Sequence, residues 1–260
     1  MIFDGNNFAQ ELTRELIEKI SRLVRKPVLA SIYNPEDIAS RVYTDIKARK
    51  ADELGIEFRK FEIRNLKFEI NELIIKINND ANVDGIMIQT PLIDRETDKK
   101  LCEMINPKKD CDGLNPESGV VPATVKAVLK ILALATPSVS PPNLGGEARS
   151  GGSMVVVGQR GLVGSELLKR LPGANGMSAN ELNIEELTSA DVVISATGRQ
   201  GLIKPEMIRE GAVCIDVGYP KGDFAPECAR KAGFFTPVPG GVGPVTVVCL
   251  FDNLLELING

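Results

Sequence analysis

The sequence predicts an α/β protein with mostly parallel sheets, divided into two domains. Short apolar segments alternate with segments of helical period along the first half of the chain, as in parallel strands joined by helices. A stretch rich in proline, glycine and serine at residues 135–153 is typical of a linker or an exposed loop. A second series of strands and helices follows it, and 260 residues with 43% hydrophobic content suffice for two cores.

The first half begins with an amphipathic helix. Apolar residues recur every three or four positions between Phe8 and Leu23, and Asn6 and Asn7 are candidate caps. Residues 28–32 then predict a short apolar strand.

A second helix follows this strand. Asn34 as N-cap and Pro35 at the first helical position predict its start, and Gly55 predicts its end. The next predicted elements are a strand, a helix and a strand, at residues 56–63, 66–77 and 85–88.

A helix at residues 123–134 precedes the linker. In the second half, apolar runs predict four strands, at residues 154–157, 191–195, 212–217 and 234–238. The segment GANGMSANELN at residues 173–183 has no strand pattern. The apolar residues 246–258 predict a final helix that must bury itself.

The chain contains no histidine, which narrows its chemistry. Ser/His/Asp and Cys/His nucleophiles and imidazole metal ligands are excluded, so acids and bases must be Lys, Tyr, Asp, Glu or Cys. The 31 basic and 35 acidic residues are mixed along the chain, which favours small-molecule partners over nucleic acid.

The expected compartment is the cytoplasm. The five cysteines are odd in number and form no CxxC, as expected of reduced thiols. The N-terminus has no signal-peptide pattern and no apolar run approaches membrane-spanning length, so no membrane association is expected.

The second helix carries three polar residues close together. Ser40, Tyr43 and Lys47 fall within an arc of about 60°, offset from the apolar stripe. That stripe consists of Ile38, Val42 and Ile46. A tyrosine and a lysine one turn apart can bind the same ligand, although a solvated helix face has the same composition.

A glycine-rich turn opens the second half. In VVVGQRGLVGSELLKRL, Gly158, Gly161 and Gly164 stand between a strand and a helix, an arrangement that binds phosphate groups. A tight structural turn explains the motif equally well, because Arg160 occupies the middle glycine position of the usual GxGxxG. Short-chain dehydrogenases also use a Tyr-xxx-Lys pair, but in those enzymes the glycine turn precedes the pair, whereas here it follows.

Three further segments contain candidate residues. Gln89 ends an apolar strand, where it can orient a ligand or simply cap the strand. Asp110 and Asp112 suggest a divalent cation or, more simply, a turn, and no metal site is expected. The segment TPVPGGVGP at residues 236–244 presents backbone N–H groups to a ligand or fixes the chain's exit from the sheet.

Taken in order, these segments resemble the bifunctional methylenetetrahydrofolate dehydrogenase/methenyltetrahydrofolate cyclohydrolase family over nearly the whole chain. The matching motifs are SxxYxxxK at residues 40–47, DGIMIQTPL at 84–92, KDCDG at 109–113, VVVGQRGLVG, ADVVISATG, GAVCIDVG and TPVPGGVGP. The resemblance implies a catalytic α/β domain at residues 1–134, completed by the C-terminal helix at 244–260. It also implies a Rossmann-like NAD(P)-binding domain at 135–243 and a cleft between the two domains.

The resemblance also implies roles for residues. Tyr43 would stack on or orient the pterin of a tetrahydrofolate derivative, Asp112 would hold its amino and amide edge, and Lys47, supported by Gln89, would serve the cyclohydrolase step. The implied substrate-binding residues are Ser40, Tyr43, Ile88, Gln89, Thr90, Asp112, Pro239, Gly240, Gly241, Val242 and Gly243. The implied residues for NADP, or alternatively NAD, are Gly158, Gln159, Arg160, Gly161, Gly164, Thr197, Gly198, Val217, Gly218 and Thr236.

The implied function is the NADP-dependent oxidation of 5,10-methylenetetrahydrofolate to 5,10-methenyltetrahydrofolate and its hydrolysis to 10-formyltetrahydrofolate. The resemblance also implies that the protein is a homodimer and that it serves one-carbon metabolism and purine biosynthesis. Hydride transfer to a nicotinamide needs positioning, and a lysine kept partly neutral beside a cationic carbon can assist hydrolysis. Neither step requires histidine.

The chain departs from the family pattern in its cofactor half. Gln159-Arg160 stands where an Arg-Ser pair is usual, Glu166 stands where a proline is usual, and residues 173–183 lack the usual strand with its His-Ser segment. We therefore expect a shortened or rebuilt cofactor platform, in which Arg160 is the candidate partner of a 2′-phosphate. Two alternatives follow: a cyclohydrolase with weak or lost dehydrogenase activity, and a non-catalytic folate-binding protein of the same fold.

Overall fold

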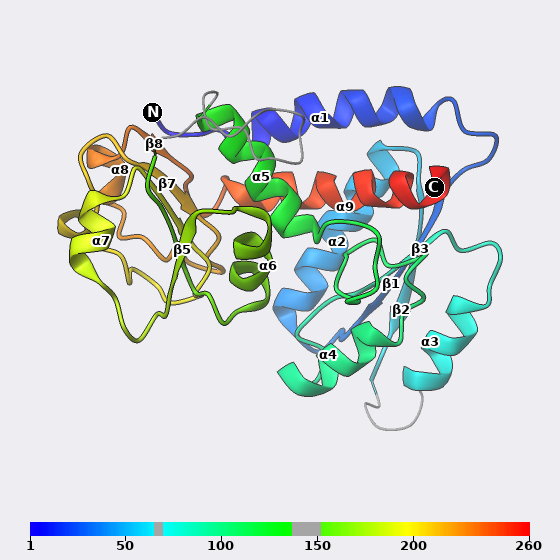
Figure 1. Cartoon of the computed structure of the whole chain (residues 1–260). Coiled ribbons are helices and arrows are strands. Elements are labelled where there is room, and N and C mark those ends of the chain that lie inside the picture. The colour runs from blue at the N-terminus through cyan, green and yellow to red at the C-terminus, as the bar shows by residue number, and fades with distance from the viewer. Residues whose placement is uncertain (65–69, 137–151) are drawn as a thin grey trace. The chain divides into compact units, whose positions relative to one another are not determined.

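The computed structural model describes residues 1–64, 70–136 and 152–260 and confirms an α/β protein with parallel sheets (Figure 1). The chain forms two compact units. The first-half unit comprises Gln10–Ala123 with Val247–Gly260, and the second-half unit comprises Met1–Ala9 with Thr124–Thr246. The expected linker and the start of the expected helix at 66–77 fall largely at residues 137–151 and 65–69, outside the described residues.

The boundary between the units lies at Ala123/Thr124 instead of after Leu134, so helix α5 (Ala123–Ala135) belongs almost entirely to the second-half unit. The first nine residues also belong to that unit. The backbone N–H of Phe3 donates to the carbonyl of Phe235 (2.8 Å), and the N–H of Phe235 donates to the carbonyl of Met1 (2.9 Å).

The first-half unit contains a three-stranded parallel sheet in the order β2-β1-β3. The strands are β1 (Val28–Tyr33), β2 (Glu57–Glu62) and β3 (Gly85–Ile88). The helices are α2 (Ile38–Glu53), α3 (Ile70–Asn78) and α4 (Arg95–Glu103), with most of α1 (Gly5–Ile20) and α9 (Val242–Asn259).

The two faces of this sheet differ in chemistry. Ala30 and Ile32 of β1 lie in an apolar core cluster with Ile74 of α3 and Leu101 of α4. Ser31 points to the opposite face, because side chains alternate along a strand. The register pairs Ser31 with Lys60, whose Nζ lies 2.6 Å from Asp45 Oδ1 of α2, so α2 covers this opposite face.

Helix α2 buries its polar side, which the sequence did not indicate. Ile38 and Val42 of the apolar stripe are 69% and 46% exposed, whereas Ser40, Thr44 and Lys47 are buried. The interpretation of Ser40 and Lys47 as part of a solvated helix face was therefore wrong. The reason is tertiary: polar Ser31 lies beneath the helix on β1, so the interface contains polar groups on both sides.

The starts of the first two helices also differ from the expectation. Asp37 is the N-cap of α2 and accepts a hydrogen bond from the Ser40 N–H (2.6 Å). Asn34 instead accepts from the Glu36 N–H in the turn before the helix (2.9 Å). Helix α1 begins at Gly5, where Asp4 accepts from the Asn7 N–H (3.0 Å).

The second-half unit contains a five-stranded parallel sheet in the order β5-β4-β6-β7-β8. The strands are β4 (Met154–Val157), β5 (Ala174–Met177), β6 (Val192–Ser195), β7 (Val213–Asp216) and β8 (Phe234–Phe235), the last shorter than expected. The helical elements are α6 (Leu162–Arg170), α7 (Ile184–Ser189), a 3-10 turn (Pro205–Met207) and α8 (Cys228–Lys231).

Strand β5 corrects the prediction that residues 173–183 contain no strand. It pairs in parallel with β4 over four positions, from Met154↔Ala174 to Val157↔Met177. The apolar pattern is missing because β5 is an edge strand that buries only Met177. A Cβ on Gly176 would lie 2.6 Å from Gln159 Oε1, so a larger residue there would displace the Gln159 side chain. The cofactor half therefore keeps its edge strand.

Helix α9 is buried, as expected of the final apolar segment. Within the described part of the chain it is the one helix long and apolar enough to span a membrane, which corrects the view that no segment approaches that length. Phe251 and Leu254 are fully buried, and the Asn253 amide donates to two carbonyl oxygens of the first-half unit. These contacts are those of a core helix.

Candidate active site

Lys47 and Gln89 come together in the first-half unit, although 42 positions separate them. The Nζ of Lys47 on α2 donates to Oε1 of Gln89, which directly follows β3, over 2.8 Å. Lys47 is only 8% exposed, and Gln89 is half-buried. The predicted support of Lys47 by Gln89 is therefore present as a direct contact.

Asp112 is the charged neighbour of Lys47. Burial lowers the pKa of the Lys47 amine, and the negative charge of Asp112 offsets part of that effect. Burial raises the pKa of Asp112, and the positive charge of Lys47 opposes it. The site thus favours an amine that gives up its proton more readily than a solvated lysine.

A network of backbone hydrogen bonds holds the loop that carries Asp112. The buried carboxylate of Asp110 accepts from the N–H groups of Gly113 (3.1 Å) and Asn115 (2.7 Å). Asn115 in turn donates from its side chain to the carbonyls of Glu103 (3.0 Å) and Ile105 (2.8 Å). The paired aspartates therefore have separate roles, since Asp110 shapes the turn that carries Asp112.

Helix α9 fixes this loop from its other side. Asn253 is fully buried, and its Nδ2 donates to the carbonyls of Cys111 (3.0 Å) and Val121 (2.8 Å). Asn253 was not singled out from the sequence, because its partners lie more than a hundred positions away and the surrounding apolar pattern gives no signal.

The remaining expected residues of this unit surround the lysine. Tyr43 is half-buried one turn before Lys47. Ser40 lies two turns before it, and its hydroxyl is buried with no partner among the described residues, as are those of Ser31 and Thr44. At the end of β3, Ile88 is buried and Thr90 is exposed.

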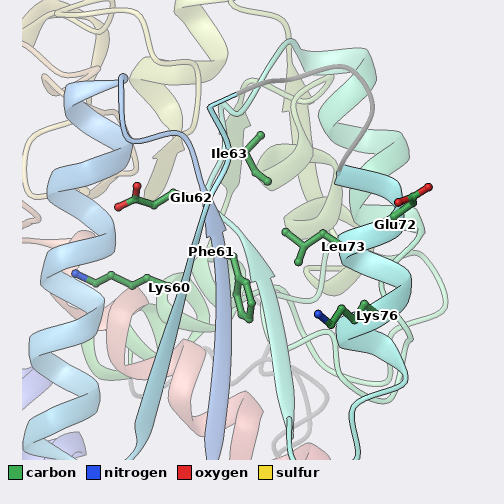
Figure 2. A pocket seen from close by; sticks show the side chains of 7 residues that line it. All are labelled: Lys60, Phe61, Glu62, Ile63, Glu72, Leu73 and Lys76. Atoms are coloured by element: carbon green, nitrogen blue, oxygen red, sulfur yellow. The ribbon is translucent and has the colours of Figure 1, made fainter.

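A separate pocket of about 440 Å³ lies between β2 and α3. Figure 2 shows Phe61 and Leu73 pointing into the space between these elements, whereas Lys60 points toward α2. The pocket is also lined by Glu62, Ile63, Glu72 and Lys76. It contains none of the residues expected at the active site. Lys47 lies on the other side of the sheet, beneath α2.

The glycine turn of the second-half unit requires glycine at two positions. Gly158 has a φ of +101°, and a Cβ there would lie 2.5 Å from the Ala196 carbonyl oxygen. A Cβ on Gly164 would lie 2.3 Å from the Gly158 carbonyl oxygen. Gly161 caps α6 without a side-chain hydrogen bond, which leaves the first N–H groups of the helix available to an anion.

The departures from the family pattern have identifiable structural roles. The Gln159 side chain lies beside Gly176 of β5, and Arg160 is exposed at the turn. Glu166 pairs with Lys169 (2.6 Å) and Arg170 within α6, which stabilises the helix. The turn and its helix therefore keep the order of strand, glycine turn and helix that the sequence predicted.

The other expected cofactor residues lie at the carboxyl end of the same sheet. Thr197 and Gly198 follow β6, and Val217 and Gly218 follow β7. Thr236 is fully buried, and its hydroxyl accepts from the Asp216 N–H (2.7 Å), so it can affect a cofactor only through the strand end that it holds.

The glycine- and proline-rich loop at 236–244 packs on the N-terminal segment of its own unit. The Gly240 carbonyl accepts from the Gly5 N–H (2.9 Å), and a Cβ on Gly5 would lie 1.9 Å from the Gly241 carbonyl oxygen. Pro239 and Gly243 are exposed, and Val242 is buried at the first position of α9. The loop therefore fixes the chain's exit from the sheet and exposes part of its surface.

Two buried aspartates at this sheet edge were also missed from the sequence. Asp216 accepts from three backbone N–H groups, and Asp223 accepts from Ser195 and Thr197. No group of three or more metal-ligating side chains is found among the described residues. The structure thus offers a buried amine in the first-half unit and a glycine turn before the start of α6 in the second-half unit.

Comparison with known proteins places both units in one family. Residues 3–112 match the catalytic domain of tetrahydrofolate dehydrogenase/cyclohydrolase, and residues 122–260 match its NAD(P)-binding domain. The bifunctional protein FolD of Halothermothrix orenii is 34% identical over 98% of this chain and 96% of its own length. FolD of Staphylococcus aureus strain Newman is 32% identical over 98% of this chain and 95% of its own.

Solved structures agree with the sequence matches. The bifunctional FolD methylenetetrahydrofolate dehydrogenase/cyclohydrolase of Campylobacter jejuni superposes with a TM-score of 0.88 at 28% identity, covering 100% of this chain and 98% of its own. The Trypanosoma brucei enzyme, solved with NADP cofactor and inhibitor, gives 0.86 at 27% identity, covering 100% and 97%. The chain belongs to the tetrahydrofolate dehydrogenase/cyclohydrolase family.

Proposed function

We propose that this chain oxidises 5,10-methylenetetrahydrofolate with NADP and hydrolyses the resulting 5,10-methenyltetrahydrofolate to 10-formyltetrahydrofolate. The observation that carries the proposal is the buried Lys47 amine, bonded to Gln89 and facing the charge of Asp112. Bifunctional relatives of matching length support both activities.

The hydrolytic step follows from the state of Lys47. Water adds its oxygen to the cationic methenyl carbon, and the neutral Lys47 amine accepts the proton that the water loses. The hydroxyl of this adduct then loses its proton to solvent and becomes the formyl C=O as the bond between the carbon and N5 breaks, and the Lys47 ammonium gives its proton to N5, so that the overall reaction releases one proton. Gln89 keeps the amine in place, because its Oε1 accepts a hydrogen bond from Nζ in both protonation states.

The oxidation step depends on positioning. The bound nicotinamide supplies the hydride acceptor, and Gly158, Gly161 and Gly164 would hold its pyrophosphate at the start of α6. Tyr43 would orient the pterin and Asp112 would bind its amino and amide edge, and the remaining residues implied by the family motifs would line the folate and cofactor sites.

The two activities can be separated in one assay. Methylenetetrahydrofolate is supplied with NADP⁺ or NAD⁺, while the absorbance of the reduced nicotinamide and of the methenyl product are both recorded. Lys47→Ala should abolish hydrolysis and let methenyltetrahydrofolate accumulate; an unchanged hydrolysis rate would remove Lys47 from the mechanism.

Cofactor binding tests the alternative of a cyclohydrolase without dehydrogenase activity. The formed strand β5 and the intact glycine turn support a working platform, whereas Gln159-Arg160 is the remaining departure. Calorimetric titration with NADP⁺ and with NAD⁺ distinguishes the bifunctional enzyme from this alternative. If neither cofactor binds at millimolar concentration, the proposed dehydrogenase activity is contradicted. Saturable folate binding with no turnover would indicate a non-catalytic protein.

The cellular setting is a further proposal. The product is a formyl donor, which suits one-carbon metabolism and purine biosynthesis. The five buried, free cysteines support a reducing cytoplasm, and the acidic balance argues against nucleic acid as a partner. The exposed Ile38 and Val42 on α2 support a homodimer, which light scattering after size exclusion would test.

A further inference from the structure

Asp223 joins two turns at the carboxyl edge of the second-half sheet. Its Oδ2 accepts from the Ser195 hydroxyl (2.8 Å) and from the backbone N–H of Thr197 (2.7 Å). Both donors belong to the end of β6 and the turn after it, whereas Asp223 lies in the loop after β7. One carboxylate oxygen therefore holds the β6 turn against the β7 loop.

The β7 loop is itself firmly anchored. The Asp216 carboxylate accepts from the backbone N–H groups of Gly218 (2.8 Å), Asp223 (3.0 Å) and Phe224 (3.0 Å). The Asp223 carbonyl accepts from the Ile203 N–H (2.9 Å). These hydrogen bonds therefore fix the position of Asp223 beside the turn after β6.

The second oxygen of Asp223 is unused in a fully buried position. Oδ1 has no hydrogen-bond partner among the described residues, and Asp223 is 0% exposed. A Cβ on Gly218 would lie 2.6 Å from this oxygen and 2.9 Å from Asp216 Oδ1, so two carboxylates crowd one glycine. A half-satisfied buried carboxylate costs stability, which argues that Asp223 is kept for what it positions.

We propose that Asp223 is a positioning residue for the dinucleotide, which acts by fixing the turn at Thr197 and Gly198 in the conformation that receives the cofactor. This inference rests on the cofactor site proposed above. The essential feature is an acceptor at the position of Oδ2, because both bonds to the turn end there.

The test compares Asp223→Ala with Asp223→Asn. The alanine variant loses both bonds to the turn, so its Kd for NADP⁺ should rise at least about tenfold. The asparagine variant can place its amide oxygen at the Oδ2 position, so it should bind within about threefold of the wild type. Calorimetry gives the Kd, and the KM for NADP⁺ should follow it.

The cyclohydrolase activity supplies a control for folding in the same molecule, because Lys47 belongs to the other unit. The cyclohydrolase rate should stay within about twofold of the wild-type rate in both Asp223 variants. Asp191→Ala is the matched control in the second-half unit: Asp191 precedes β6, where it accepts from the Ser153 N–H (3.0 Å) and pairs with Arg209. It should leave the Kd for NADP⁺ unchanged.

Wild-type affinity in Asp223→Ala would overturn the proposal, and so would an equal loss in Asp223→Ala and Asp223→Asn. Should the alanine variant not fold, Ser195→Ala removes one of the two bonds and should raise the Kd about two- to fivefold, while an unchanged Kd overturns the proposal. Failure of the wild type to bind either dinucleotide would instead contradict the proposed function.

Discussion

The Lys47 amine and the Gln89 amide oxygen lie 2.8 Å apart and join α2 to the end of β3. Gln89 is neutral, so it holds the lysine without adding a charge–charge attraction to its ammonium form. Gln89→Glu should raise the pKa of Lys47, because a carboxylate favours the ammonium form. The pH at which enzymatic hydrolysis reaches half its maximal rate should then rise by about one unit or more.

The measurement is the rate of methenyltetrahydrofolate loss against pH, with the uncatalysed rate subtracted. Gln89→Met is the matched control, because it removes the acceptor without adding a charge. It should lower the rate without moving the profile upward. Identical profiles for the wild type and Gln89→Glu would show that a neutral Lys47 does not limit hydrolysis.

Asn253 should be essential to the loop that carries Asp112. Asn253→Ala removes both bonds to the carbonyls of Cys111 and Val121 and leaves those buried oxygens unpaired. The free energy of unfolding should fall by about 2–4 kcal/mol, and the KM for folate should rise. Urea unfolding and steady-state kinetics measure the two effects.

Asp252→Ala is the control, because Asp252 neighbours Asn253 on α9. Its ion pair with Lys19 spans 3.7 Å and involves a largely exposed lysine, so the loss should stay below about 1 kcal/mol. Equal stability losses in the two variants would contradict the role given to Asn253.

Gly164→Ala should separate the two activities. The added Cβ would lie 2.3 Å from the Gly158 carbonyl oxygen, so the glycine turn must shift away from the start of α6. NADP⁺ binding should weaken at least about tenfold, equivalent to about 1.4 kcal/mol, with cyclohydrolase activity retained. Gly119→Ala is the control, because a Cβ there meets no atom within 4 Å, and it should change neither NADP⁺ binding nor cyclohydrolase activity. Unchanged NADP⁺ affinity in Gly164→Ala would argue against the turn as the phosphate site.

Asp110 should give the protein an unusual dependence of stability on pH. Burial raises its pKa to about 6, above the value of 3.8 that it has when exposed. Between these two pKa values Asp110 is protonated in the folded chain and ionised in the unfolded chain. The contribution of Asp110 to the free energy of unfolding therefore falls as the pH rises from about 4 to 6, and it is lost above pH 6.

Asp110→Asn removes this titration. The free energy of unfolding of the wild type, measured relative to the variant, should therefore fall by about 2 kcal/mol between pH 4 and pH 7. Denaturant unfolding at several pH values measures the difference. A constant difference across this range would show that Asp110 keeps an ordinary pKa in the folded protein.

Much of the fold could be predicted from the sequence because its signals are local. The apolar runs located β4, β6 and β7, and apolar periodicity located α5 and α9. The glycine turn was equally evident, since only glycine fits at Gly158 and Gly164. The order of its motifs also sufficed to identify the family, which the matches to both domains confirm.

The tertiary structure decided what local pattern does not encode. The solvated-face interpretation of the polar side of α2 was wrong, because burial depends on what lies beneath the helix, and Ser31 on β1 makes that interface polar. Strand β5 was missed because an edge strand forms by backbone pairing with β4 and needs few apolar side chains.

The sequence by itself determined the family, the order of the elements and the residue types available for catalysis without histidine. Only the tertiary structure brought Lys47 to Gln89, Asn253 to Cys111 and Asp223 to Thr197. Each of these contacts joins groups that are distant along the chain. Their formation depends on which strands pair and which helix faces are buried, and periodicity within one segment carries no information about either.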